Sequence, residues 1–146
     1  MEVLIEYLPS YDVVEWGELK QAYEGDAGFD VRAVEDTLIE PHTWALIKLG
    51  IKSSIPVGYE VQLRSRSGLS LKEGLFLLNG VGTIDCNYRG EWGAIVANFS
   101  GSPYRVLRGD RIAQAVVQML PTVTITRGLV DATDRGVGGF GSSGKK

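Results

Sequence analysis

Apolar and polar residues alternate along much of the chain, which is the pattern of β-strands with one buried face. In residues 57–64, for example, every second side chain from Tyr59 to Leu63 is apolar, and the residues between them are polar. Further short strand-like runs, separated by Gly, Pro and Ser, lie at residues 2–7, 29–33, 43–49 and 75–78. Residues 92–99 are apolar almost throughout and predict a strand covered on both faces.

Two segments have a helical pattern instead. Residues 16–23 are compatible with a short helical turn. In residues 111–120 (RIAQAVVQML) the apolar positions recur at helical spacing, and Asp110 is a suitable N-cap directly before them. Periodicity alone therefore favours a helix over residues 111–120.

Composition narrows the fold class. With 146 residues, the chain has the length of a single domain, since domains typically run to about 100–200 residues. Glycine provides 19 of these 146 residues, well above the usual share of about 7%. Because glycine weakens helices and serves tight turns, this excess favours many short strands. We expect residues 1–133 to form a β-domain and the glycine-rich residues 134–146 to be its mobile C-terminal segment.

Charge and cysteine content limit the possible partners. The net charge is −3 and the pI is about 5.2, and an acidic chain of this kind repels nucleic-acid polymers. Cys86 is the single cysteine, so no intrachain disulfide can form and the cysteine pattern does not indicate secretion. The N-terminus has no signal-peptide pattern, and no apolar run approaches the ~20 residues of a membrane span. We therefore expect a cytoplasmic protein without a membrane partner.

Residues 82–91 (GTIDCNYRGE) are the first candidate for chemistry. We interpret them as a hairpin whose flanking strands hold the Asp85 carboxylate at its mouth, where it can act on a water molecule. General-base catalysis of this kind contributes about 10²–10⁴ in rate. The competing explanation is a turn-forming Asp that bonds its own backbone, which is the more common case for such a segment taken alone.

Residues 64–70 (RSRSGLS) are the second candidate. They combine hydroxyl, guanidinium and backbone N–H groups around Gly68, which lets a ligand come close, so they suit an oxyanion. A solvated polar loop explains the same composition equally well. Guanidinium groups beside bare backbone suit a small phosphorylated ligand, and four arginines lie near Gly or Ser: Arg66, Arg89, Arg111 and Arg135.

The C-terminal segment is the third candidate. Phe140 is an aromatic residue without apolar neighbours in the sequence, so stacking on a base is a plausible role for it, worth about 1–3 kcal/mol. The competing explanation is an artificial terminal extension. That explanation fits the residues from Ser142 onward but leaves Arg135 and Phe140 without a role.

Five segments, in their order along the chain, resemble the motifs of the homotrimeric dUTPase family. They are residues 27–33 (AGFDVRA), 66–69 (RSGL), 82–91, 109–114 (GDRIAQ) and 135–144 (RGVGGFGSSG). The resemblance implies an all-β, jelly-roll-like fold with a flexible glycine-rich C-terminal lid, and a homotrimer with active sites where subunits meet. It also implies a strand at residues 111–120, against their helical periodicity. Residues 7–25 are less typical of the family and receive no function.

The family hydrolyses dUTP to dUMP and pyrophosphate, which removes dUTP and supplies dUMP for thymidylate synthesis. Asp85 resembles the base that orients water for attack on the α-phosphorus. Tyr88 resembles the residue that packs under the deoxyribose, where a 2′-hydroxyl would clash. The resemblance also implies contacts to the substrate base or sugar from Asn79, Gly82, Thr83, Ile84 and Gly93.

The remaining family roles concern the phosphates and the lid. The phosphate-binding positions correspond to Arg66, Ser67, Gly68 and Gln114. Asp30 resembles a carboxylate that reaches Mg²⁺ through water, with the ion held mainly by substrate phosphates. The lid places an aromatic ring, here Phe140, over the uracil. Its substrate-binding positions correspond to Arg135, Phe140, Gly141, Ser142 and Ser143.

Two other functions remain open. A dCTP deaminase shares the fold, but its chemistry needs a glutamate on the strand after the 82–91 segment, and residues 94–98 (AIVAN) contain no carboxylate. The second is a jelly-roll module that binds a nucleotide or a protein partner without turnover, because fold does not determine function.

Overall fold

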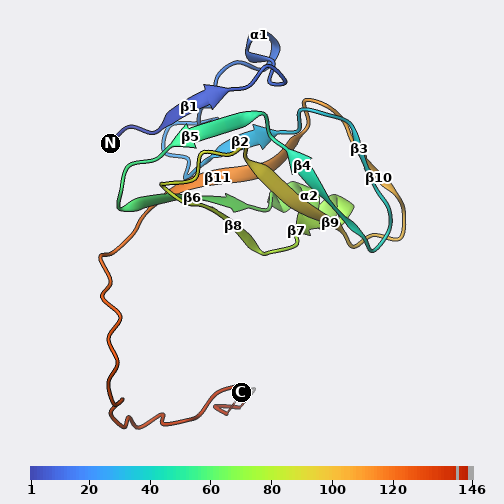
Figure 1. Ribbon diagram of the computed structural model, residues 1–146. Coiled ribbons are helices and arrows are strands. Elements are labelled where there is room, and N and C mark those ends of the chain that lie inside the picture. Colours follow the sequence, from blue (N-terminus) through green and yellow to red (C-terminus); the bar gives the residue numbers. More distant parts are fainter. Residues whose placement is uncertain (141, 145–146) are drawn as a thin grey trace.

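The computed structural model describes residues 1–140 and 142–144 of the chain. Most of its regular structure is antiparallel β-sheet, as predicted (Figure 1). The four-stranded sheet has the strand order β2 (Phe29–Arg32), β11 (Arg111–Met119), β6 (Tyr59–Arg64) and β8 (Val81–Ile84). The three-stranded sheet has the order β4 (Trp44–Lys48), β9 (Gly93–Asn98) and β7 (Leu75–Leu77).

Two strand pairs and two short helices complete the described part of the domain. The pairs are β1 (Leu4–Tyr7) with β5 (Ile51–Ser54), and β3 (Thr37–Ile39) with β10 (Tyr104–Val106). The helices are α1 (Val13–Trp16) and α2 (Ser67–Glu73). Neither helix has the length and apolar character needed to cross a membrane.

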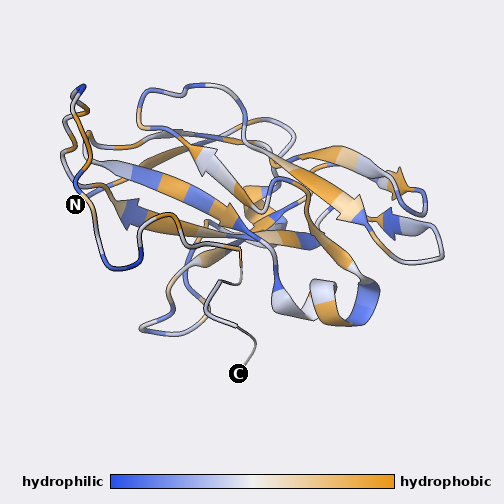
Figure 2. Ribbon diagram, turned by 90° about the horizontal axis from the view of Figure 1, so that it is seen from below, coloured by the Kyte–Doolittle hydropathy of each residue, from blue (hydrophilic) through white to orange (hydrophobic). Residues whose placement is uncertain are grey.

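The two larger sheets contribute to one hydrophobic core, which gives the chain an all-β, jelly-roll-like fold. Val61 and Leu63 of β6 are buried, as the alternation predicts, and Figure 2 shows this alternation along the strands. The largest fully buried side chain is Trp92, whose indole Nε1 donates a hydrogen bond to Ser53 Oγ at 3.1 Å. The indole therefore adds apolar contact area to the core without leaving its N–H unsatisfied.

Residues 111–120 are mainly a strand, so the helical periodicity was misleading and the family resemblance is confirmed at this point. Two features produce the helix-like spacing. The register against β2 shifts at Ile112, so a bulge interrupts the regular alternation. In addition, β11 lies between β2 and β6 and carries buried residues on both faces. Asp110 does not cap a helix; its Oδ2 accepts a hydrogen bond from the Leu107 N–H at 2.9 Å.

Residues 82–91 are not a hairpin of paired strands, so that interpretation is wrong. β8 pairs with β6 in the four-stranded sheet, whereas β9 pairs with β4 and β7 in the three-stranded sheet. The ladders of the described residues contain no pairing between β8 and β9. The chain therefore crosses from one sheet to the other here, and Asp85 lies at the crossing.

The helices also differ from expectation. α1 ends at Trp16, where the predicted helical turn of residues 16–23 begins, and residues 17–23 are irregular. The α1 N-terminus is capped by Asp12, whose Oδ1 accepts a hydrogen bond from the Glu15 N–H at 2.9 Å. α2 begins at Ser67, inside the segment that composition marked as a possible polar loop.

Beyond β11 the chain leaves the body of the domain, as residues 121–140 show in Figure 1. We call residues 121–146 the C-terminal arm. Just before it, the Leu120 N–H still donates to the Gly58 carbonyl at 2.7 Å. Within residues 121–140 and 142–144, the hydrogen bonds join residues of the arm only to one another. The arm is thus attached to the domain at its first residues alone.

Gly28 provides a test of the packing between β2 and β11. A Cβ at this position would overlap the Ala115 carbonyl oxygen and lie 2.8 Å from Val116 Cγ2. Because main chain of a central strand cannot move aside cheaply, Gly28→Ala should destabilise the fold by about 1–3 kcal/mol. Thermal unfolding at one protein concentration measures the loss. Gly101→Ala is the matched control, since no atom lies within 4 Å of its added Cβ; equal midpoints for the two variants would contradict the prediction.

Candidate active site

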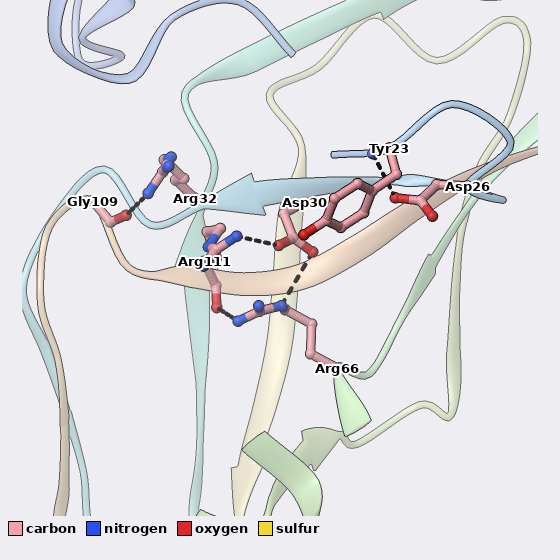
Figure 3. Close-up of polar contacts among 7 residues, drawn as sticks. All are labelled: Tyr23, Asp26, Asp30, Arg32, Arg66, Gly109 and Arg111. Atoms are coloured by element: carbon pink, nitrogen blue, oxygen red, sulfur yellow. Dashed lines mark hydrogen bonds and ion pairs between the residues drawn. The ribbon is translucent and has the colours of Figure 1, made fainter. Parts of the chain in front are cut away.

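Neighbouring strands of the four-stranded sheet bring one acidic and two cationic side chains together (Figure 3). Asp30 lies in β2, Arg111 begins β11, and Arg66 follows the end of β6. Asp30 Oδ1 accepts a hydrogen bond from Arg66 Nε at 3.1 Å, and its Oδ2 lies 3.3 Å from Arg111 Nη1. Arg66 Nη1 also donates to the Arg111 carbonyl oxygen at 2.8 Å. We call these three residues the Asp–Arg cluster.

Gln114 lies beside the Asp–Arg cluster because of the bulge in β11. It stands directly opposite Asp30 on one side and Arg64 on the other. Arg111 and Gln114 are three positions apart, so in a regular strand they would face opposite sides of the sheet. The register shift at Ile112 offsets this difference, and both residues line the same cavity.

A cavity of about 530 Å³ opens at the Asp–Arg cluster, and we call it the anion cavity. Outside the C-terminal segment, the residues predicted to bind phosphate or to reach magnesium all line it: Asp30, Arg66, Ser67, Gly68 and Gln114. Ser67 and Gly68 belong to the first turn of α2, where backbone N–H groups have no acceptor within the helix. The cationic side chains of the lining, Lys20, Arg32, Arg66 and Arg111, outnumber its carboxylates, Glu18, Asp26 and Asp30, by one. The cavity therefore has the donors and the charge to hold an anion.

One wall of the anion cavity comes from N-terminal residues to which sequence reasoning assigned no function. Trp16, Lys20 and Gln21 belong to this wall. It is fixed to the domain because the Leu19 N–H donates to the Tyr7 hydroxyl at 2.8 Å. No motif marks these residues, since the contacts that place them join positions without regular spacing. Composition marked Arg111 among the arginines suited to a phosphorylated ligand, but the family resemblance assigned it no role, although it lies beside Gln114 in the 109–114 segment.

Tyr11 supports the same wall. Burial raises the pKa of its phenol above the ordinary value of 10.0, with a smaller raising effect from Tyr7 and a lowering effect from Arg32. The phenol is therefore protonated at neutral pH and donates a hydrogen bond to the Gly17 carbonyl at 3.3 Å. The Trp16 ring meets the Tyr11 ring edge-on, with centroids 5.1 Å apart.

A second cavity, of about 330 Å³, lies at the crossing between the sheets, and we call it the Asp85 cavity. Five of the residues predicted to act on the base, the sugar or the water line it: Thr83, Ile84, Asp85, Tyr88 and Gly93. The Asp85 side chain is exposed, and its carboxylate makes no hydrogen bond or ion pair to the rest of the described chain. It is therefore free to accept a proton from a water molecule.

Hydrogen bonds to its own backbone carbonyls hold the turn that carries Asp85. The Tyr88 N–H donates to the Asp85 carbonyl at 3.1 Å. Arg89 Nη1 donates to the Cys86 and Tyr88 carbonyls at 2.7 and 2.9 Å. Asp85 thus takes part in the turn through its main chain, whereas the turn-forming role weighed for its side chain is not seen among the described residues.

The structure does not bring all predicted residues together. The two cavities share no lining residue, and Asn79 and Gly82 line neither of them. Arg135, Phe140, Ser142 and Ser143 lie in the C-terminal arm and also line neither cavity. Gly141 lies outside the described residues. One chain therefore presents two separate half-sites.

The donor set constrains any metal ion. Among the described residues there is no group of three or more His, Cys, Asp or Glu side chains that could hold one. Both Asp30 oxygens already face guanidinium groups. The anion cavity suits a magnesium ion whose ligands come mainly from a bound phosphate and from water.

Comparison with known proteins agrees with this geometry. The dUTPase family model matches residues 15–144. The deoxyuridine 5′-triphosphate nucleotidohydrolase of Picosynechococcus sp. is 49% identical over 128 residues, which are 86% of this chain and 89% of the relative. A structure of Staphylococcus bacteriophage 80alpha dUTPase with dUpNHpp has a TM-score of 0.82 at 27% identity and covers 98% of each chain.

A further structure, of a dUTPase from phage phi11 of S. aureus, is described with a structural Mg(II) ion. It has a TM-score of 0.77 at 25% identity and covers 88% of this chain and 97% of the phage chain. Because the family model spans the chain from residue 15 to residue 144 and nearly half of the aligned residues are identical in the Picosynechococcus relative, this chain belongs to the dUTPase family.

Proposed function

We propose that this chain hydrolyses dUTP to dUMP and pyrophosphate, with Asp85 as the base that activates the attacking water. The observation that carries the proposal is the Asp85 carboxylate, which lies at a cavity without a partner among the described residues, in a chain of the dUTPase family. The reaction removes dUTP and supplies dUMP for thymidylate synthesis.

In the proposed reaction Asp85 accepts a proton from water while the water oxygen attacks the α-phosphorus. The bond between the α-phosphorus and the oxygen that bridges to the β-phosphate breaks, and pyrophosphate leaves with that oxygen. Positioning and charge stabilisation provide most of the catalysis in phosphoryl transfer. The two half-sites therefore matter as much as the base.

The Asp85 cavity is the proposed site of the uracil and the deoxyribose. Backbone groups at Thr83, Ile84 and Gly93 can read the acceptor–donor–acceptor edge of uracil in a slot too narrow for the methyl group of thymine. A side chain at Gly93 would close this slot, since its Cβ would lie 2.8 Å from Leu46 Cδ1. The Tyr88 ring is the proposed contact of the deoxyribose. Asn79 and Gly82, which precede this cavity along the chain, remain proposed contacts of the base.

The anion cavity is the proposed site of the triphosphate. Arg66, Ser67, Gly68 and Gln114 would bind phosphate oxygens, because guanidinium, hydroxyl, amide and backbone N–H donors all suit them. Asp30 would orient Arg66 and reach a magnesium ion through water. When bound, the ion offsets the negative charge that collects on the phosphate oxygens.

We also propose a homotrimer whose active sites form between subunits. The outer face of the three-stranded sheet is largely apolar: its cross-strand neighbours are Trp44, Leu46, Phe76, Ile95 and Ala97, with Lys48 beside Gly93 at one end. Trp44 and Leu46 are 63% and 60% exposed, which is unusual for large apolar side chains that lie side by side. Leu46 and Ile95 also line the Asp85 cavity. A second subunit packed on this face would thus reach the cavity and could bring its own anion cavity to Asp85.

Residues 134–146, the last part of the C-terminal arm, are the proposed lid. Its described residues bond only to one another, and Phe140 is fully exposed, so the lid is free to close on a bound nucleotide. Closure would lay Phe140 on the uracil and bring Arg135, Ser142 and Ser143 to the γ-phosphate, with Gly141 between them in the chain. Such closure excludes bulk water and aligns the triphosphate.

A substrate panel tests the proposed function directly. The purified protein is offered each deoxynucleoside triphosphate and UTP with magnesium, and pyrophosphate and ammonia are measured. We expect pyrophosphate release from dUTP alone. Ammonia release from dCTP would instead identify a deaminase, which the absence of a carboxylate in β9 argues against. Binding of dUTP without turnover would identify a nucleotide-binding module.

Asp85→Asn tests the base. The variant should bind dUTP with near-normal affinity but lose turnover by about 10²–10⁴, because the amide keeps the shape and cannot accept the proton. Calorimetry measures the affinity and pyrophosphate release measures the turnover. Glu35→Gln is the control, since it removes a carboxylate from an exposed position away from both cavities. Near-normal turnover by Asp85→Asn would remove Asp85 from its proposed role.

Removal of residues 134–146 tests the lid. Most activity should be lost while sedimentation shows an unchanged oligomeric state, because the arm makes no described contact with the core. A truncated protein that retains full activity would contradict a lid.

Phe140→Ala tests the proposed contact with the uracil. The variant should weaken dUTP binding by about fivefold or more, the equivalent of losing about 1 kcal/mol of stacking. Val137→Ala is the matched control in the same exposed segment. Unchanged dUTP affinity in Phe140→Ala would contradict the stacking of this ring on the uracil.

A further inference from the structure

The Tyr88 ring lies against Gly90 in the turn that leads from β8 to β9. A Cβ added to Gly90 would overlap the Tyr88 hydroxyl oxygen and would lie 2.5 Å from Tyr88 Cζ and 2.9 Å from Cε2. Real Cβ atoms essentially never approach other atoms closer than 3.0 Å. Any side chain at this position therefore forces the ring to move.

A hydrogen bond fixes the tip of the same ring. The Tyr88 hydroxyl donates to the Glu91 carbonyl at 3.0 Å. Glu91 is itself attached to the domain, because its Oε1 accepts a hydrogen bond from the Gly50 N–H at 3.1 Å. The next residue, Trp92, is fully buried and donates its N–H to the Ile51 carbonyl at 2.8 Å. The ring is thus held against a piece of backbone that the core keeps in place.

The backbone at Gly90 does not itself need glycine. Its φ is not among the positive values that other glycines of the chain adopt, so an alanine fits the main-chain conformation. The atoms in the way belong to the far end of the Tyr88 side chain, which is 44% exposed and has room to turn toward solvent. The missing side chain at residue 90 therefore has one evident local consequence, the position of the Tyr88 ring.

We propose that Gly90 is a positioning residue for sugar selection, because its lack of a side chain forms the seat that holds the Tyr88 ring. The inference rests on the proposed function, in which this ring meets the deoxyribose. Tyr88 lines the Asp85 cavity, so the ring position sets the space beside the sugar. With the ring in its seat, a 2′-hydroxyl has no room; with the ring displaced, a ribose fits and UTP becomes a better substrate.

The experiment compares kcat/KM for dUTP and UTP in the wild-type protein, Gly90→Ala and Gly101→Ala. Rejection of an added hydroxyl by shape alone reaches about 10², and Gly90→Ala should lower the preference for dUTP over UTP by about tenfold. Gly101→Ala adds the same methyl group where no atom lies within 4 Å, and it should keep the wild-type preference. Thermal unfolding and sedimentation accompany each variant.

The outcomes separate this inference from the proposed function. A wild-type protein that does not hydrolyse dUTP overturns the proposed function. A wild-type protein that prefers dUTP, together with a folded Gly90→Ala variant of unchanged preference, overturns only the role of Gly90. If Gly90→Ala does not fold, the position of the ring is tested with Tyr88→Phe instead. This substitution adds no atoms and removes the hydrogen bond to the Glu91 carbonyl. Its preference should fall by about threefold, as for loss of one hydrogen bond, and an unchanged preference overturns the inference.

Discussion

Asp30 holds two arginines from different parts of the four-stranded sheet, and the anion cavity depends on this contact. Arg66 and Arg111 carry like charges, and without a carboxylate between them they would repel each other. Each Asp30 oxygen faces one guanidinium group, at 3.1 and 3.3 Å. Because all three side chains are partly exposed, the ion pairs contribute little to folding. Their main consequence is that two planar donors are oriented before a ligand arrives, while the cluster keeps a net positive charge.

The bulge at Ile112 makes this arrangement possible, and it also explains where sequence reasoning failed. A regular strand would place Arg111 and Gln114 on opposite faces of the sheet. The bulge puts both at the anion cavity and at the same time gives β11 an apolar spacing that resembles a helix. Periodicity assumes a uniform strand, so it misread the segment, whereas the motif in residues 109–114 did not depend on that assumption. The bulge that brings Arg111 and Gln114 to one cavity is therefore a local irregularity, and prediction from a regular period does not detect it.

Other parts of the fold were predictable to different degrees. The alternation of β6 was read correctly because one of its faces packs on the core, and Val61 and Leu63 are buried as expected. The prediction of a hairpin at residues 82–91 was wrong, since the sequence of a turn does not reveal whether the strands on either side of it pair with each other. No motif marked the N-terminal wall with Trp16 and Lys20, because aromatic packing and hydrogen bonds of irregular spacing place it. Sequence motifs thus pointed to the residues that line the two cavities with Asp85 and Arg66, but they gave no sign of the N-terminal wall.

The residues proposed for catalysis and for substrate choice lie in one turn at the crossing of the two sheets. The Asp85 carbonyl accepts the Tyr88 N–H, so the proposed base and the proposed sugar contact are parts of one hydrogen-bonded unit. A change that loosens the turn would therefore move both Asp85 and Tyr88. The Tyr88 ring can also move without Asp85, because its contacts with Gly90 and the Glu91 carbonyl do not involve that hydrogen bond. The groups proposed to bind phosphate line a different cavity of the same chain. In the trimer that we propose, a neighbouring subunit completes each site. Assembly then brings the turn with Asp85 and Tyr88 from one chain next to the Asp–Arg cluster of another, which a single chain does not do.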